Sequence, residues 1–84
     1  MNITIYTQPN CTYCDQAKAL MKSKGVAYQE LILNVGQKQE EGKTYIPVAQ
    51  LKARLPNAKT MPQILDGNTL IGGFDQLKKF LRYE

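Results

Sequence analysis

The stretch that decides the fold reads NITIYTQPNCTYC, residues 2–14. Residues 2–7 alternate polar and apolar side chains and are rich in β-branched and aromatic types, which is typical of a strand. Pro9 cannot donate to a strand ladder, and Asn10 is a favoured residue at the N-cap of a helix. From Cys11 onward, apolar residues recur at spacings of three and four. The sequence therefore predicts a strand followed at once by a helix that begins at a pair of cysteines.

The remainder of the chain continues this alternation of strands and helices. The first helix ends near Gly25, because a cationic last turn followed by glycine is a common helix stop. The patterns then predict a strand over 26–33, an irregular loop over 34–44, a helix over 47–55, a hairpin of strands 62–65 and 69–71 around Asp66-Gly67-Asn68, and a helix over 74–81. We therefore expect one α/β domain over residues 1–84 with the order βαβαββα, in which a four-stranded mixed sheet is flanked by helices and the first two strands are parallel.

The composition excludes several kinds of chemistry. The 84 residues contain no His, no Trp and only two Cys, so a Ser-His-Asp or Cys-His catalytic pair is impossible and a four-ligand zinc site lacks its ligands. We expect no bound metal. The net charge of +4 is scattered rather than gathered into a basic run, which argues against nucleic acid as the partner. Apolar runs are too short to span a bilayer or form a signal peptide, so we expect no membrane association and a cytoplasmic protein.

The two cysteines are the residues best placed for catalysis. Cys11 lies where the free amides and partial positive charge of a helix N-terminus favour a thiolate over a thiol, which makes it a candidate nucleophile. Cys14 follows three residues later on the same helical face, where its sulfur lies deeper and can resolve a mixed disulfide on Cys11. Lys18, one turn further, is a possible source of additional positive charge. The structural alternatives are half of a zinc knuckle and a static disulfide; both are weaker, because the other zinc ligands are missing and static disulfides are uncommon inside cells.

Three motifs together resemble the glutaredoxins in order and spacing: IYTQPNCTYC at 5–14, TMPQI at 60–64 and IGGFDQL at 71–77. The resemblance covers most of the chain, is weakest over 34–58, and is closest to the short glutaredoxins of bacteria and their phages. It implies a thioredoxin fold and the glutathione-dependent reduction of disulfides and glutathione mixed disulfides. Cys11 matches the attacking cysteine of the family and Cys14 matches the resolving one.

The same resemblance implies a glutathione site. Thr60, Met61 and Pro62 match a segment with a cis proline whose backbone binds the cysteinyl part of glutathione, a form of strand addition. From the residues alone, a trans proline in an ordinary turn is the simpler interpretation.

The other end of the glutathione site is implied by Gly73, Phe74 and Asp75, which resemble the segment that binds the γ-glutamyl end. Two glycines permit close approach of backbone to a ligand, and helix N-terminal amides bind carboxylates. From sequence alone, Asp75 is first a favourable charge at a helix start, and Tyr13 is an exposed aromatic beside a loop; the resemblance places both at the glutathione site.

Two positions depart from the pattern of the family. Gln8 stands where many glutaredoxins have a lysine that contacts the glycine carboxylate of glutathione, and Lys59 or another basic residue is a candidate replacement. Thr12 stands where proline is commoner. Because that proline discourages iron-sulfur cluster binding in the family, Thr12 leaves open an alternative function, a dimer that holds a [2Fe-2S] cluster through Cys11 and glutathione.

The expected partners follow from the same resemblance. They are glutathione as co-substrate and disulfide-containing proteins, with ribonucleotide reductase as the expected client of a bacterial or phage member, and the expected state is a monomer. Two further alternatives remain open at this point: a redoxin reduced by thioredoxin reductase, and a thiol switch that does not turn over.

Overall fold

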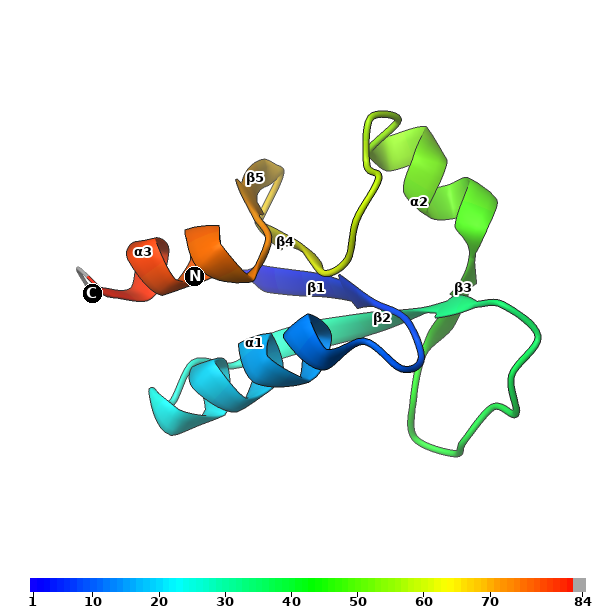
Figure 1. Ribbon diagram of the computed structural model, residues 1–84, viewed down its shortest axis with the longest axis horizontal. Helices are drawn as coiled ribbons and strands as arrows, with labels where there is room; N and C mark the ends of the chain where they lie inside the picture. The colour runs from blue at the N-terminus through cyan, green and yellow to red at the C-terminus, as the bar shows by residue number, and fades with distance from the viewer. Residues whose placement is uncertain (83–84) are drawn as a thin grey trace.

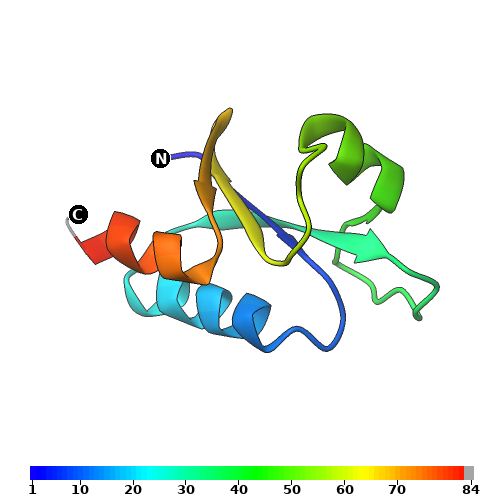
Figure 2. The same ribbon diagram turned by 45° about the horizontal axis from the view of Figure 1, so that its top comes forward.

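The computed structural model describes residues 1–82 and has a mixed sheet with helices on both faces (Figure 1). Helices α1 and α3 lie side by side on one face, and α2 lies on the other (Figures 1 and 2). The elements in chain order are β1 (Ile3–Thr7), α1 (Thr12–Ser23), β2 (Tyr28–Asn34), β3 (Tyr45–Pro47), α2 (Val48–Arg54), β4 (Gln63–Asp66), β5 (Thr69–Gly72) and α3 (Phe74–Arg82).

The sheet has the strand order β3-β2-β1-β4-β5. Strand β1 is parallel to β2 on one side and antiparallel to β4 on the other, so the expected mixed sheet and the expected parallel first pair are both present. The α1 crossover between β1 and β2 makes the parallel pairing possible, because parallel neighbours need a long connection. Strands β4 and β5 form the expected hairpin, in which Gly67 has φ +60°.

The expected number of strands was wrong, because the sheet within residues 1–82 has five strands rather than four. The additional strand is β3, which pairs in parallel with the end of β2 through Ile32, Leu33 and Asn34. Three residues are too short to show a period-2 pattern, and Pro47 suggested a helix start in the sequence. Pro47 fits here because β3 is an edge strand and ends at this residue.

The core has two layers, one on each face of the sheet. Alternate residues of a strand point to opposite faces, so Ile5 of β1 packs towards α1 and α3 whereas Tyr6 packs towards α2. The first layer contains Ile3, Ile5, Ala17, Met21, Ile64, Leu77 and Leu81. The second layer contains Tyr6, Leu33, Ile46, Leu51 and Leu65. Because both faces are covered, every residue of β1 is buried, including Thr4 and Thr7.

Within residues 1–82, no helix is both long enough and apolar enough to cross a bilayer.

Candidate active site

The cysteine pair lies at the start of α1, immediately after the loop that leaves β1. The N-cap of this helix is Cys11 and not Asn10, so that prediction was wrong by one residue. Asn10 instead adopts φ +57°, a left-handed conformation that asparagine tolerates better than most residues. The Sγ atom of Cys11 accepts a hydrogen bond from the backbone N–H of Cys14 at 3.2 Å, the bond that a capping side chain makes. A free helix amide thus points directly at the sulfur of Cys11.

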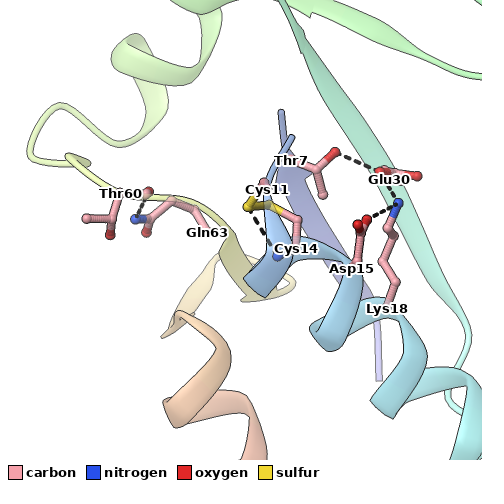
Figure 3. The surroundings of a disulfide bond; sticks show 8 residues. All are labelled: Thr7, Cys11, Cys14, Asp15, Lys18, Glu30, Thr60 and Gln63. Carbon is pink, nitrogen blue, oxygen red and sulfur yellow. Dashed lines mark hydrogen bonds and ion pairs between the residues drawn. A yellow bond between two sulfur atoms is a disulfide. The ribbon is translucent and has the colours of Figure 1, made fainter. Parts of the chain in front are cut away.

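The two cysteines differ in depth, as expected. They are joined by a disulfide, with their Cα atoms 5.2 Å apart. Cys14 is 1% exposed, whereas Cys11 is partly exposed. In Figure 3 the disulfide lies between the Thr60–Gln63 segment on one side and Glu30 on the other. Cys11 is therefore the sulfur of the pair that is more accessible from outside, and Cys14 lies beneath the surface.

A cavity of about 280 Å³, which we call the Phe74 cavity, is lined in part by Tyr13, one of the two residues between the cysteines in the chain. The structure brings together in its lining all seven residues that the sequence assigned to glutathione. These residues are Tyr13, Thr60, Met61, Pro62, Gly73, Phe74 and Asp75, and Gln76 completes the lining. The peptide bond between Met61 and Pro62 is cis, as the resemblance implied and the simpler turn interpretation did not.

The glycine pair at the start of α3 has two different structural roles. Gly72 has φ +127°, and a Cβ atom there would lie 2.8 Å from Cγ of Gln76, so the fold itself requires glycine. A Cβ atom on Gly73 would meet nothing closer than 3.5 Å, which is ordinary contact. The packing of the chain therefore does not explain glycine at position 73, whereas close approach of a ligand in the Phe74 cavity would.

The sequence analysis missed Gln76. Its Oε1 accepts a hydrogen bond from the N–H of Gly73 at 2.9 Å, while Gly73 accepts one from the N–H of Leu77 at 3.0 Å. This arrangement resembles a capping box, in which the N3 residue reaches back to the N-cap amide. The signal was present in the sequence, since glutamine stands three residues after a glycine that precedes an apolar helical pattern.

The aromatic rings of Tyr13 and Phe74 belong to the lining of the Phe74 cavity, and Lys78 lies next to Phe74. The rings of Tyr13 and Phe74 are 6.1 Å apart between centroids, and Tyr13 is 60% exposed. Lys78 places its Nζ 5.0 Å from the centroid of Phe74 and 3.4 Å from Oδ1 of Asp75. The sequence analysis missed Lys78 as a cation beside this cavity, although its spacing of three from Asp75 is the helical spacing for an ion pair.

Gln8, Lys18 and Lys59, which the sequence raised as positions bearing on the charge near the site, do not line the Phe74 cavity. Gln8 and Lys59 are both exposed. Gln8 borders a polar cleft formed with the 37–45 region, and Lys59 borders a groove on the other side of Thr60. Lys18 points its ammonium at Glu30, with an Nζ to Oε2 distance of 2.9 Å.

Thr7, Lys18 and Glu30 form a polar cluster, which we call the Glu30 cluster, on the side of α1 away from Thr60 (Figure 3). The hydroxyl of Thr7 donates to Oε2 of Glu30 at 2.7 Å, and Lys18 donates to the same oxygen. Partial burial alone would raise the pKa of Glu30, but the hydrogen bonds from Thr7 and Lys18 and the positive charges of Lys18 and Lys43 together lower the pKa below its usual value. The cluster therefore holds an ionised carboxylate that ties α1 to the sheet.

Across residues 1–82, no three or more His, Cys, Asp or Glu side chains gather as a possible metal site.

A helix that begins at a two-cysteine motif, set against a mixed sheet and a cis proline segment, defines a thiol-disulfide oxidoreductase of the thioredoxin-like class. The sequence model of the glutaredoxin family matches residues 3–71. The chain belongs to the glutaredoxin family.

Known relatives support this assignment. The chain is 40% identical over 75 residues to Glutaredoxin 1 of Rickettsia bellii (strain RML369-C), covering 89% of this chain and 71% of the relative. It is 38% identical over 78 residues to Glutaredoxin 3 of Escherichia coli (strain K12), covering 90% and 81%. It is also 34% identical to Hybrid peroxiredoxin hyPrx5 of Haemophilus influenzae (strain ATCC 51907 / DSM 11121 / KW20 / Rd), of which it spans 29%.

Solved structures confirm the thioredoxin-like fold. Glutaredoxin 1 from Francisella tularensis, solved with cacodylate, superimposes with a TM-score of 0.71 at 24% identity, covering 98% of this chain and 93% of that one. The glutaredoxin from Brucella melitensis superimposes with a TM-score of 0.67 at 30% identity, covering 99% of this chain and 80% of that one. A buckwheat glutaredoxin in complex with glutathione gives 0.63 at 20% identity, covering 96% and 68%.

Proposed function

We propose that this protein is a glutathione-dependent dithiol oxidoreductase that reduces protein disulfides and glutathione mixed disulfides. The observation that carries the proposal is the position of Cys11. Its sulfur accepts the amide of Cys14 at a helix start, beside a cavity lined by all seven residues of the expected glutathione site. A helix N-terminus stabilises a thiolate, which is the attacking form in disulfide exchange.

The reaction needs only thiols. The Cys11 thiolate attacks one sulfur of a protein disulfide, which breaks that disulfide and forms a mixed disulfide with Cys11. Cys14 then attacks the sulfur of Cys11, releases the substrate as a dithiol and leaves the Cys11–Cys14 disulfide seen here. Two glutathione molecules restore the dithiol and leave as glutathione disulfide, so that two electrons pass from glutathione to the substrate. With a glutathione mixed disulfide, Cys11 takes up the glutathionyl sulfur and the substrate thiol leaves.

We assign glutathione to the Phe74 cavity. The backbone of Thr60, Met61 and Pro62 would bind the cysteinyl part by strand addition. The start of α3 would bind the γ-glutamyl end, with helix amides facing its carboxylate and Asp75 facing its ammonium. Tyr13 would cover the ligand from the side of Cys11. Support comes from the shared cavity, from the space above Gly73, and from the glutathione complex of the buckwheat relative.

The choice of reductant tests this function directly. We expect disulfide reduction by the protein to be rapid with glutathione, NADPH and glutathione reductase, and to be absent with NADPH and thioredoxin reductase. Each system is offered separately at equal protein concentration, and NADPH oxidation is recorded. A protein that turns over only with thioredoxin reductase would be the alternative redoxin, and one that turns over with neither would be a thiol switch.

We also propose the oligomeric state, the location and the client proteins of this chain. Residues 1–84 form one glutaredoxin domain that acts as a monomer in the cytoplasm on proteins with exposed disulfides, among them ribonucleotide reductase. A reconstituted assay measures deoxyribonucleotide formation with this protein and glutathione as the electron source. No formation above a control without the protein would remove ribonucleotide reductase from its clients.

A second candidate function is favoured by Thr12, which is exposed at the first position of α1 and departs from the proline that the glutaredoxin resemblance leads one to expect there. This function is a dimer that holds a [2Fe-2S] cluster through Cys11 and glutathione. Anaerobic reconstitution with iron, sulfide and glutathione, followed by a visible spectrum and size measurement, tests it. A coloured dimer would support the cluster function, and a colourless monomer would exclude it.

A further inference from the structure

The positive charge of the chain is concentrated in one segment. Residues 42–65 contain four of the eleven Lys and Arg residues and none of the seven Asp and Glu residues. The other parts of the chain therefore hold seven of each, and the formal net charge of +4 belongs to this segment alone. The segment contains α2 and the connection that leads to Thr60 at the Phe74 cavity.

Three of these four cations have no acidic partner within residues 1–82: Lys52, Arg54 and Lys59. Lys52 donates to the backbone oxygen of Ala58. The guanidinium of Arg54 is fixed by neutral acceptors, namely the hydroxyl of Tyr6 at 3.0 Å and oxygens of the β4–β5 turn. The charges of Lys52 and Arg54 are thus held in place by neutral acceptors, and Lys59 adds a third, exposed cation.

Two of these cations, Arg54 and Lys59, line a mainly apolar groove, which we call the Leu70 groove. It has a volume of about 340 Å³ and is lined by residues 54–60, Gln63 and Leu70. Figure 2 shows how the connection from α2 to β4 runs beside the β4–β5 hairpin that carries Leu70. Leu70 is 50% exposed on the edge strand β5. Leu55 and Pro56 add apolar surface, and Arg54 and Lys59 supply the charge of the lining.

Thr60 lines both the Leu70 groove and the Phe74 cavity, so the two hollows adjoin at this residue. A polypeptide whose disulfide meets Cys11 can therefore extend past Thr60 into the groove. Positive charge around an apolar floor suits a segment that carries both carboxylates and a large apolar side chain.

We propose that the Leu70 groove binds an acidic segment of the disulfide-bearing client, next to its reactive cysteine, with an apolar side chain against Leu70. The proposal rests on the proposed function and specifies its substrate class. The chemistry at Cys11 and Cys14 is unchanged, and the groove lowers the KM for clients of this type.

The test uses two peptides, each with an intramolecular disulfide. One has Asp, Glu and Leu beside its cysteines, and the other has Lys in place of the acidic residues. A small disulfide, hydroxyethyl disulfide, reports the basal chemistry. Activity is measured as kcat/KM in the glutathione-coupled assay, at low and at high salt, because attraction between exposed charges is screened by salt.

Three variants of the full chain accompany the wild type. Lys59→Glu reverses one charge of the groove, and Leu70→Thr removes its exposed apolar side chain. Lys22→Glu makes the same charge change on an exposed residue near the end of α1 opposite to Cys11. Arg54 is left intact, because its bonds to Tyr6 and the hairpin contribute to the fold.

We expect the wild type to prefer the acidic peptide by about tenfold at low salt and by much less at high salt. Lys59→Glu should lower kcat/KM for the acidic peptide about five- to twentyfold, and Leu70→Thr several-fold, while hydroxyethyl disulfide is reduced normally. Equal kcat/KM values of the wild type for the two peptides would overturn the proposal that the groove binds an acidic segment. A loss of kcat/KM in Lys22→Glu as large as that in Lys59→Glu would overturn it as well. A wild type that does not reduce even hydroxyethyl disulfide would instead overturn the proposed function.

Discussion

At the scale of single residues, Cys11 combines two roles that are usually separate. It is the N-cap of α1, a position that Ser, Thr, Asp and Asn usually occupy, and it is the attacking sulfur of the proposed mechanism. The amide of Cys14 that bonds to the capping sulfur would also stabilise a thiolate there once the disulfide is reduced. On this proposal, capping and nucleophilicity have one physical cause.

The first prediction concerns the reactivity of Cys11. In the reduced protein, we expect Cys11 to be alkylated by iodoacetamide well below the pH of about 8.5 at which a free cysteine is half ionised. Cys14 should be protected, because it is 1% exposed. Alkylation rates from pH 4 to pH 9 by mass spectrometry, with unfolded protein as control, measure this. If Cys11 reacts only as fast as cysteine in the unfolded chain, the helix does not activate it.

The second prediction separates the two glycines. Gly72→Ala should destabilise the fold by about 2–3 kcal/mol, because alanine is strained at positive φ and its Cβ would meet Gln76. Gly73→Ala should change the free energy of unfolding by less than about 1 kcal/mol, yet raise the KM for glutathione several-fold, since the new methyl group would enter the Phe74 cavity. Urea unfolding and steady-state kinetics on both variants decide this. A Gly73→Ala protein with an unchanged KM would remove glutathione from that side of the cavity.

The placement of residues was predictable where the resemblance supplied a motif, and less so where it depends on packing. The seven residues now found around one cavity were identified from three separated motifs. The division of labour between Gly72 and Gly73 could not be predicted, because it depends on φ and on the position of Gln76. The N-cap was misplaced by one residue, because Asn10 is the better capping residue by preference and only the backbone turn moves the cap to Cys11.

At the scale of elements, the Glu30 cluster fastens α1 to β2 behind the cysteine pair. Its ion pair between Lys18 and Glu30 is mostly shielded, with side-chain exposures of 25% and 21%. Thr7 and Glu30 are 23 residues apart in sequence, so no local sequence pattern could predict the Glu30 cluster. The cluster holds the helix that carries Cys11 in a fixed register with the sheet.

The third prediction concerns the pH dependence of stability. Because the pKa of Glu30 is lower in the folded protein than in the unfolded chain, its stabilising contribution is complete at neutral pH and is lost as the pH falls through the folded pKa. Glu30→Gln should therefore cost about 1–2 kcal/mol at pH 7, and this difference should shrink below about pH 4. Glu41→Gln, at an exposed residue, is the matched control. A difference that stays constant from pH 7 to pH 3 would show that the carboxylate charge of Glu30 does not stabilise the fold.

Helices and strands were predicted correctly where the apolar period was clear, and a strand was missed where it was too short to show a period. Helices α1 and α3 and the hairpin were expected within one or two residues of their observed bounds, because their apolar stripes and turn residues are clear. Strand β3 was missed because three residues carry no period, and its existence depends on the distant end of β2. Tertiary pairing, and not local preference, makes it a strand.

At the scale of the whole molecule, an inventory of two Cys and no His excludes His-assisted catalysis and favours thiol exchange. The fold supplies what exchange requires: one cysteine at a helix start, its partner buried beneath it, and a cavity beside them. The uneven charge adds a second surface, the Leu70 groove, on the far side of Thr60. Composition predicted the chemistry well, whereas the concentration of charge around one groove becomes meaningful only in three dimensions.

The measurement that tests the central claim most directly is the glutathione-coupled reductase assay on the wild type, Cys11→Ser and Cys14→Ser, with a protein disulfide and a glutathionylated peptide as substrates. We predict that the wild type reduces both, that Cys11→Ser loses at least about a hundredfold in rate on both, and that Cys14→Ser loses only the protein disulfide. Full activity in Cys11→Ser would contradict the account.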